Sequence, residues 1–93
     1  MIPPVGTFPG GSAYAMVRDV ASGHLMVTER TLKNLDPPDL GTLSFELERH
    51  LREIRAEQPP LEDTTAVQQR NRRIQRINAA HMILRSYRMK NQI

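Results

Sequence analysis

The sequence predicts an all-α protein built on an antiparallel helical hairpin. Apolar residues recur at three- and four-residue steps over two segments, about 42–57 and about 64–90, and two prolines separate these segments. The seven prolines and five glycines of the 93-residue chain lie mostly in residues 1–41, where regular structure is correspondingly reduced. A chain of this length forms one small domain, which we place at residues 12–93, after an extended arm at residues 1–11.

The arm contains three prolines and three glycines. Proline withholds a backbone donor and fixes φ, while glycine loosens the backbone between the prolines. Ile2, Val5 and Phe8 lie three residues apart, which is the repeat of a polyproline II helix and puts them on one side. The arm is therefore expected either to be disordered or to lie along a partner's surface.

One or two short helices are expected between the arm and the hairpin. Ser12 can cap a helix that stops at Gly23, because serine accepts a hydrogen bond from the first turn and glycine adopts the left-handed conformation that ends helices. Thr28 can cap a second short helix over about residues 29–35. The residues between them, 24–28, fit either an extended piece or a continuation of the first helix.

The first long helix has an apolar stripe that should face a second helix. Asp39 or Thr42 would cap it, because Pro37 and Pro38 are expected to break the chain, and Pro59-Pro60 would end it. Residues three and four apart share one side of a helix. The stripe consists of Leu40, Leu43, Leu47, Leu51 and Ile54.

The second long helix, capped by Asp63 or Thr64, has more apolar surface than the rest of the chain can cover. Between residues 79 and 84 the apolar side chains spread around most of its circumference, and Met82 and Met89 form a further strip. This excess predicts a partner protein. The expected partner-binding residues are Leu43, Leu47, Leu51, Ile77, Met82, Ile83, Tyr87 and Met89.

Charge is divided unevenly along the chain. Residues 1–63 carry 6 Lys/Arg and 10 Asp/Glu, a net of −4, and residues 64–93 carry 7 Lys/Arg and no acid, a net of +7, giving +3 in all. A basic segment that follows an acidic one is typical of contact with nucleic acid or with an acidic partner. The alternative is that the two segments neutralise each other by packing together.

Four arginines, Arg70, Arg72, Arg73 and Arg76, form the densest basic cluster. The last three share a helical face, and arginine favours bidentate contact with phosphate or carboxylate. The cluster is therefore a candidate contact for nucleic acid or for an acidic partner, and a merely solvated face is the third interpretation. No aromatic residue is interleaved with it and no nucleic-acid motif accompanies it, which favours a protein partner.

Residues with obvious chemical function are few. The chain has no cysteine, which excludes disulfides, thiolate nucleophiles and cysteine-based zinc sites. His24, His50 and His81 do not have metal-ligand spacing. We interpret the Glu46-His50-Glu53 strip as a salt-bridged face and His81 as an interface or core residue. Motifs such as GxSxG and GxxxxGK[ST] do not occur. No catalytic, cofactor-binding or metal site is predicted, and the protein is not expected to be an enzyme.

The sequence thus predicts a non-catalytic accessory or scaffolding subunit of a larger intracellular complex, which binds partner proteins through amphipathic helices. One alternative is a subunit that contacts RNA or DNA through the basic face of the last helix. A second alternative is a small regulator of an enzyme or a membrane protein. No apolar run reaches the roughly 18 residues of a membrane span, so membrane insertion is not expected. The expected location is the cytoplasm or nucleus, with an organelle left open.

Overall fold

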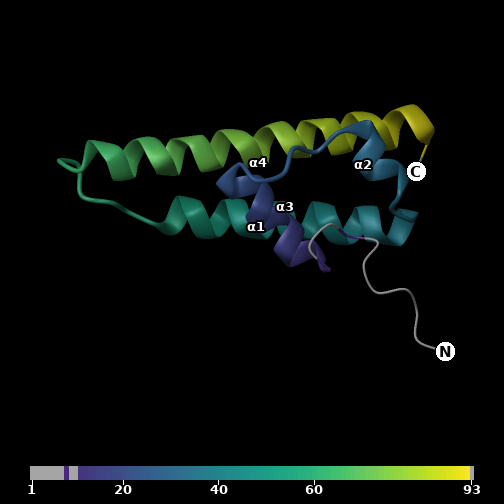
Figure 1. Ribbon diagram of the computed structural model, residues 1–93, viewed down its shortest axis with the longest axis horizontal. Helices are drawn as coiled ribbons and strands as arrows, with labels where there is room; N and C mark the ends of the chain where they lie inside the picture. The colour runs from purple at the N-terminus through teal and green to yellow at the C-terminus, as the bar shows by residue number, and fades with distance from the viewer. Residues whose placement is uncertain (1–7, 9–10, 93) are drawn as a thin grey trace.

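In the part that the structure describes, the chain is folded into helices, which confirms the predicted all-α hairpin with two short helices. The computed structural model describes Phe8 and residues 11–92, and most of the predicted arm lies outside the described residues. The helices are α1 (Ala13–Ser22), α2 (Glu29–Lys33), α3 (Pro37–Ala56) and α4 (Thr64–Asn91). As Figure 1 shows, α3 and α4 run antiparallel, α1 packs across both, and α2 lies on the C-terminal part of α4.

Both short helices begin where their capping residues predict, and α1 also ends at the predicted glycine, whereas α2 ends at Lys33, two residues before its predicted end. Ser12 accepts a hydrogen bond from the Ala15 amide at 3.1 Å, and Gly23 ends α1 in the left-handed conformation with φ of 87°. Thr28 accepts from the Thr31 amide at 3.3 Å and begins α2. Residues 25–28 belong to no helix, so the extended interpretation of this segment is the correct one.

The prediction that Pro37 and Pro38 keep α3 from starting before Asp39 was wrong. The helix begins at Pro37, and Asp36 is its N-cap residue. The first helical positions need no hydrogen bond from their backbone N–H groups, and the fixed φ of proline suits them, so the two prolines fit the first turn. Asp39 supports this start, since its carboxylate accepts a hydrogen bond from the Asp36 amide at 3.4 Å.

The turn between the long helices follows the two prolines. Glu57 ends α3 in extended conformation, and Asp63 begins α4, where its carboxylate accepts from the Ala66 amide at 3.0 Å. This end of the hairpin lies beyond α1 (Figure 1), and the side chain of Leu61 in the turn is 89% exposed. The molecule is accordingly elongated, with extents of 51 × 31 × 19 Å.

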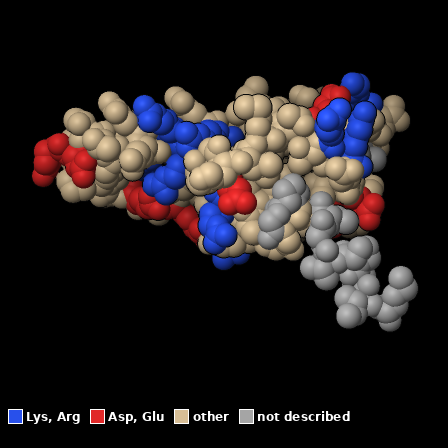
Figure 2. Space-filling view, viewed as in Figure 1, with Lys and Arg blue, Asp and Glu red and all other residues tan. Residues whose placement is uncertain are grey.

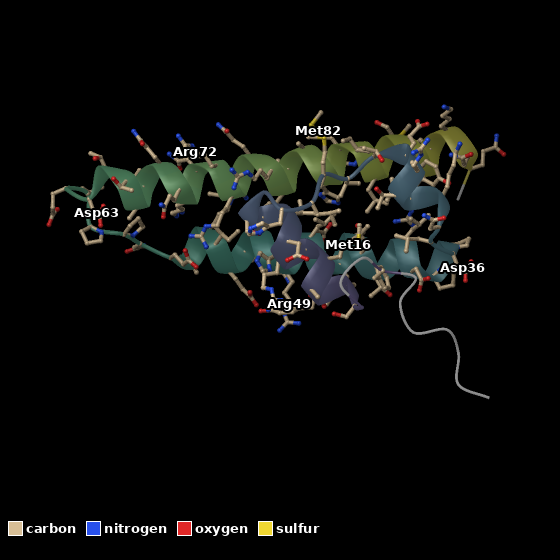
Figure 3. The ribbon with its side chains drawn as sticks, viewed as in Figure 1. Met16, Asp36, Arg49, Asp63, Arg72 and Met82 are labelled. Carbon is tan, nitrogen blue, oxygen red and sulfur yellow. The ribbon has the colours of Figure 1, made fainter. Side chains whose placement is uncertain are left out.

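The core fills the space enclosed by α1, α3 and α4. Met16 and Val17 of α1 are fully buried against the hairpin, and Figure 3 shows Met16 between the helices. Burying a side chain of this size contributes about 1.5–3 kcal/mol relative to leaving it in water. The fully buried side chains of the long helices and α2 are Leu32, Leu40, Leu43, Leu47, Ile77 and, within 2%, Ile54 and Leu84.

Candidate partner-binding surface

Three of the residues predicted to bind a partner lie instead in the core of the chain. Leu43, Leu47 and Ile77 have no exposed surface, because the stripe of α3 packs directly against α4 and α1 covers both. Leu51 and Tyr87 are partly buried and pack against the same core. In this fold, Leu43, Leu47 and Ile77 belong to the core of the hairpin, and Leu51 and Tyr87 remain partly exposed at its edge.

The other three predicted residues lie on the surface, all on α4. The side chains of Met82 and Met89 are 68% and 75% exposed, and Ile83 is 36% exposed. Met82 points away from the helix pair in Figure 3. The two methionines lie seven residues apart, so they share one side of the helix. Together with Met26, which is 79% exposed, and with Ala79, these residues form what we call the methionine surface.

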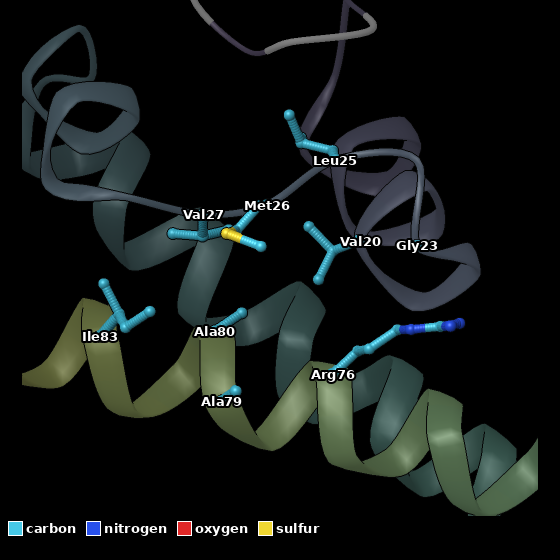
Figure 4. Close-up of a pocket in the computed structure, with 9 residues that line it drawn as sticks. All are labelled: Val20, Gly23, Leu25, Met26, Val27, Arg76, Ala79, Ala80 and Ile83. Carbon is cyan, nitrogen blue, oxygen red and sulfur yellow. The ribbon is translucent and has the colours of Figure 1, made fainter.

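An apolar groove joins Met26 to α4. The extended segment around Met26 and the α4 residues Ala79 and Ile83 line its walls, and Figure 4 shows these side chains facing one another. The groove has a volume of about 250 Å³, and Arg76 lies at its end beneath Gly23. Methionine is flexible and polarisable, so such a surface adapts to the shape of an apolar ligand.

A polar hollow lies on the other side of the methionine surface, between α3 and α4. His81 Nε2 is 3.3 Å from Ser44 Oγ and 3.8 Å from Glu48 Oε1, and Arg85 and Arg88 complete the walls. Both Ser44 and Glu48 approach the same ring nitrogen. They therefore do not form a relay in which one group orients the histidine and the other gives it a proton. His81 joins the two helices, as expected for an interface histidine.

The arginine cluster is mostly engaged by the chain itself. Arg70 Nε donates to the carbonyls of Ile54 and Glu57 at 3.2 and 3.0 Å, and its Nη2 donates to the carbonyl of Arg55 at 3.0 Å. These carbonyls belong to the C-terminal end of α3, which carries the negative end of the helix dipole and lacks intrahelical donors. Arg70 therefore caps α3 from α4.

Arg76 does the same for α1. Its Nη1 donates to the carbonyl of Ala21 at 3.0 Å. The guanidinium lies so close to Gly23 that a Cβ built there would be 3.0 Å from Arg76 Cζ. Glycine at this position thus has two roles, since it adopts positive φ and leaves room for the arginine.

The remaining two arginines of the cluster differ from each other. Arg73 forms an ion pair with Glu57 at 2.6 Å. Arg72 is exposed and forms no hydrogen bond or ion pair within residues 11–92. In Figure 2, basic side chains gather over the first half of α4, and a second group lies near its C-terminal end. Part of the charge asymmetry is therefore neutralised by packing: Glu57 binds Arg73, and Glu29 binds Lys90 at 3.4 Å.

The Glu46-His50-Glu53 strip has the predicted salt-bridged character. Arg49 lies between the two carboxylates, 3.4 Å from Glu46 and 3.3 Å from Glu53. His50 meets the ring of Tyr14 edge to face at 5.9 Å, and the Arg49 guanidinium lies 5.9 Å from the same ring centroid. The carboxylates and the imidazole each have a partner from the chain.

Met26 and Phe45 are among the exposed apolar residues that sequence reasoning did not identify. Met26 lies between Leu25 and Val27, which turn inward, so alternation along an extended segment would have placed it outside. Phe45, 56% exposed, lies two residues from both Leu43 and Leu47 and therefore off their stripe. Both the alternation around Met26 and the spacing of Phe45 from the leucine stripe can be read from the sequence.

The fold and the surface define a small all-α chain with an exposed apolar surface on its longest helix. The chain matches no family model, no curated protein and no solved structure. Among the described helices, none has the length and apolar character needed to cross a membrane.

Proposed function

We propose that the protein is a non-catalytic accessory subunit that binds a partner protein through the methionine surface of α4. The observation that carries this proposal is the exposure of Met82 and Met89 on α4 and of Met26 on the segment across the groove, which are 68%, 75% and 79% exposed. Exposed apolar side chains that adjoin an apolar groove are typical of interaction sites. Covering these side chains would stabilise a complex because it removes apolar surface from water.

The basic cluster gives less support to the nucleic-acid alternative. Arg70 and Arg76 bind backbone carbonyls and Arg73 binds a carboxylate, so Arg72 alone of the four is without a partner in the described residues. A phosphate chain would have to compete with these intramolecular contacts. Within residues 11–92, no such contact covers Met26, Met82 or Met89, and we therefore favour a protein partner.

Site-specific photo-crosslinking in the cells that make the protein tests the proposal. A photoreactive residue at position 82 should form a discrete adduct with a partner protein, and the adduct should survive nuclease treatment. Position 61 is the matched control, since Leu61 is equally apolar and 89% exposed but lies in the turn at the far end of the hairpin. Equal adducts from both positions, or none from position 82, would contradict the proposal.

A substitution pair gives an independent measurement. Met82→Asp places a charge in the proposed contact, where an unpaired charge is costly, and should abolish recovery of the complex in a pull-down. Leu61→Asp adds the same charge at the turn and should leave recovery unchanged. Both side chains are exposed in the free protein, so the thermal stability of the chain should change little in either variant.

A further inference from the structure

We infer that the segment bound by the methionine surface is an acidic amphipathic helix of another protein. This inference rests on the proposed function and specifies the chemistry of the partner. It is carried by charge: the helix that bears most of the surface contains no carboxylate, and Arg85 and Arg88 form no ion pair in the described residues, although Glu48 lines the same hollow.

The first step concerns the whole of α4. Between Thr64 and Asn91 the helix has seven basic residues and no acidic residue. Of these basic residues, only Arg73 and Lys90 form ion pairs with carboxylates in the part of the chain that the structure describes. Arg70 and Arg76 bind carbonyl groups, which carry partial rather than full negative charge, so most of their positive charge remains. A positive potential therefore extends over the surface and attracts an acidic partner.

The second step concerns the cations beside the methionines. Arg85 follows Met82 by three residues and precedes Met89 by four, so its side chain starts between them on the helix surface. Arg85 is exposed, and Arg88 borders the same hollow as Met89. Neither arginine forms an ion pair in the described part of the chain. A carboxylate placed beside the apolar side of a bound helix would reach Arg85.

The third step concerns the shape of the partner. Met82 and Met89 are two turns apart, a span of about 10 Å along a straight helix. A second helix with apolar residues at positions i, i+3 or i+4, and i+7 matches this spacing. A symmetric pair of copies fits less well, because the surface would then meet itself and α4 offers no carboxylate to the facing Arg85.

Three synthetic helical peptides test the inference. They share apolar residues at positions one, four and eight and differ only in flanking residues, which are all Glu, all Gln or all Lys. Fluorescence anisotropy with the full chain should show the Glu peptide binding about tenfold or more tightly than the Gln peptide, with the Lys peptide weakest. The preference should shrink as salt is raised.

Two matched variants locate the effect. Arg85→Glu should weaken the Glu peptide and strengthen the Lys peptide. Arg72→Glu makes the same charge change ten residues before Met82 and should alter both affinities only slightly, because exposed charges farther apart than about 10 Å are largely screened at 0.1 M salt. Circular dichroism should give the same helix content for both variants, since both side chains are exposed and form no ion pair or hydrogen bond within residues 11–92.

Four results with the peptides and the variants would overturn the inference. The first is equal affinity for all three peptides, and the second is an equal loss of affinity for the Glu peptide in the two variants. The third is that no peptide binds at millimolar concentration. The fourth is a concentration-dependent dimer in sedimentation that Met82→Asp dissociates. A 20-nucleotide single strand that competes with the Glu peptide would also overturn it and identify a phosphate chain as the occupant. If position 82 still formed a crosslinked adduct with a partner protein, the proposed function would stand although the inference of an acidic helix had failed.

Discussion

The arginines of α4 form two groups that differ in what they contact. Arg70 and Arg76 turn toward the body of the protein and cap the C-terminal ends of α3 and α1. Arg72 and Arg85 turn outward and have no partner within residues 11–92. All four are the same residue type on the same helix, so neither composition nor clustering determines their role. What determines it is whether another helix ends within reach.

The apolar residues of α4 also divide into inward and outward groups. Substitutions in these two groups should give the largest difference in the free energy of unfolding. Ile77 is fully buried and Met82 is 68% exposed. Ile77→Ala should lower the free energy of unfolding by about 2–5 kcal/mol, because it removes a buried side chain and leaves a cavity. Met82→Ala should change it by less than about 0.5 kcal/mol. Urea denaturation of the two variants measures both, and similar losses would show that the surface methionine is part of the core.

The next effect concerns the inward arginines. Arg70→Gln removes three hydrogen bonds to the carbonyls of Ile54, Arg55 and Glu57. Hydrogen bonds to a charged group are worth about 1.5–3 kcal/mol, and we expect a loss in this range because Arg70 is partly buried.

Arg72→Gln is the matched control for Arg70→Gln. It removes the same charge from an exposed side chain that has no partner among the described residues, and it should cost less than about 0.5 kcal/mol. Chemical denaturation of the two variants under the same conditions measures the difference. Equal stability of Arg70→Gln and Arg72→Gln would mean that capping from α4 does not hold the end of α3.

A smaller effect is expected at Gly23. Gly23→Ala imposes φ of 87° on an alanine, which costs about 1–2 kcal/mol, and places a Cβ 3.0 Å from Arg76 Cζ. Because the arginine end is flexible, it should move and lose part of its bond to Ala21. A double-mutant cycle with Arg76→Gln measures this coupling. If the two substitutions changed the free energy of unfolding additively, the Arg76 side chain would move without weakening its hydrogen bond to Ala21.

The helix starts show what the sequence predicts well. Ser12, Thr28 and Asp63 each cap the helix that local spacing assigns to them, because capping involves residues three apart in the chain. Leu43 and Leu47 lie on the inner side of α3, as their spacing predicts. These features depend on one helix at a time, so a local pattern is sufficient to identify them.

The functions of the arginines and leucines could not be predicted in the same way. Arg76 reaches a carbonyl 55 residues earlier in the chain, and Arg70 reaches carbonyls 13 to 16 residues earlier. No local pattern encodes which helix end lies beside α4. For the same reason, Leu47 could be recognised as inward-facing, but whether it faced this chain or a partner depended on how α1 crosses the hairpin.

The smallest expected effect distinguishes the two macromolecular partners through Arg72. If all four arginines of the cluster contacted phosphates of a B-form duplex, each contact would add about 0.9 to the slope of log binding constant against log salt concentration. Together they would contribute about 3.6. Because Arg70, Arg73 and Arg76 bind groups of the chain itself, we expect the cluster to contribute no more than about 0.9, which Arg72→Gln should remove. Filter binding to a short duplex between 0.05 and 0.3 M salt measures the slope.

A slope near 3.6 would require these arginines to leave their intramolecular partners on binding. It would then be accompanied by loosening of the α3 end, which hydrogen exchange at Arg55 and Ala56 would detect.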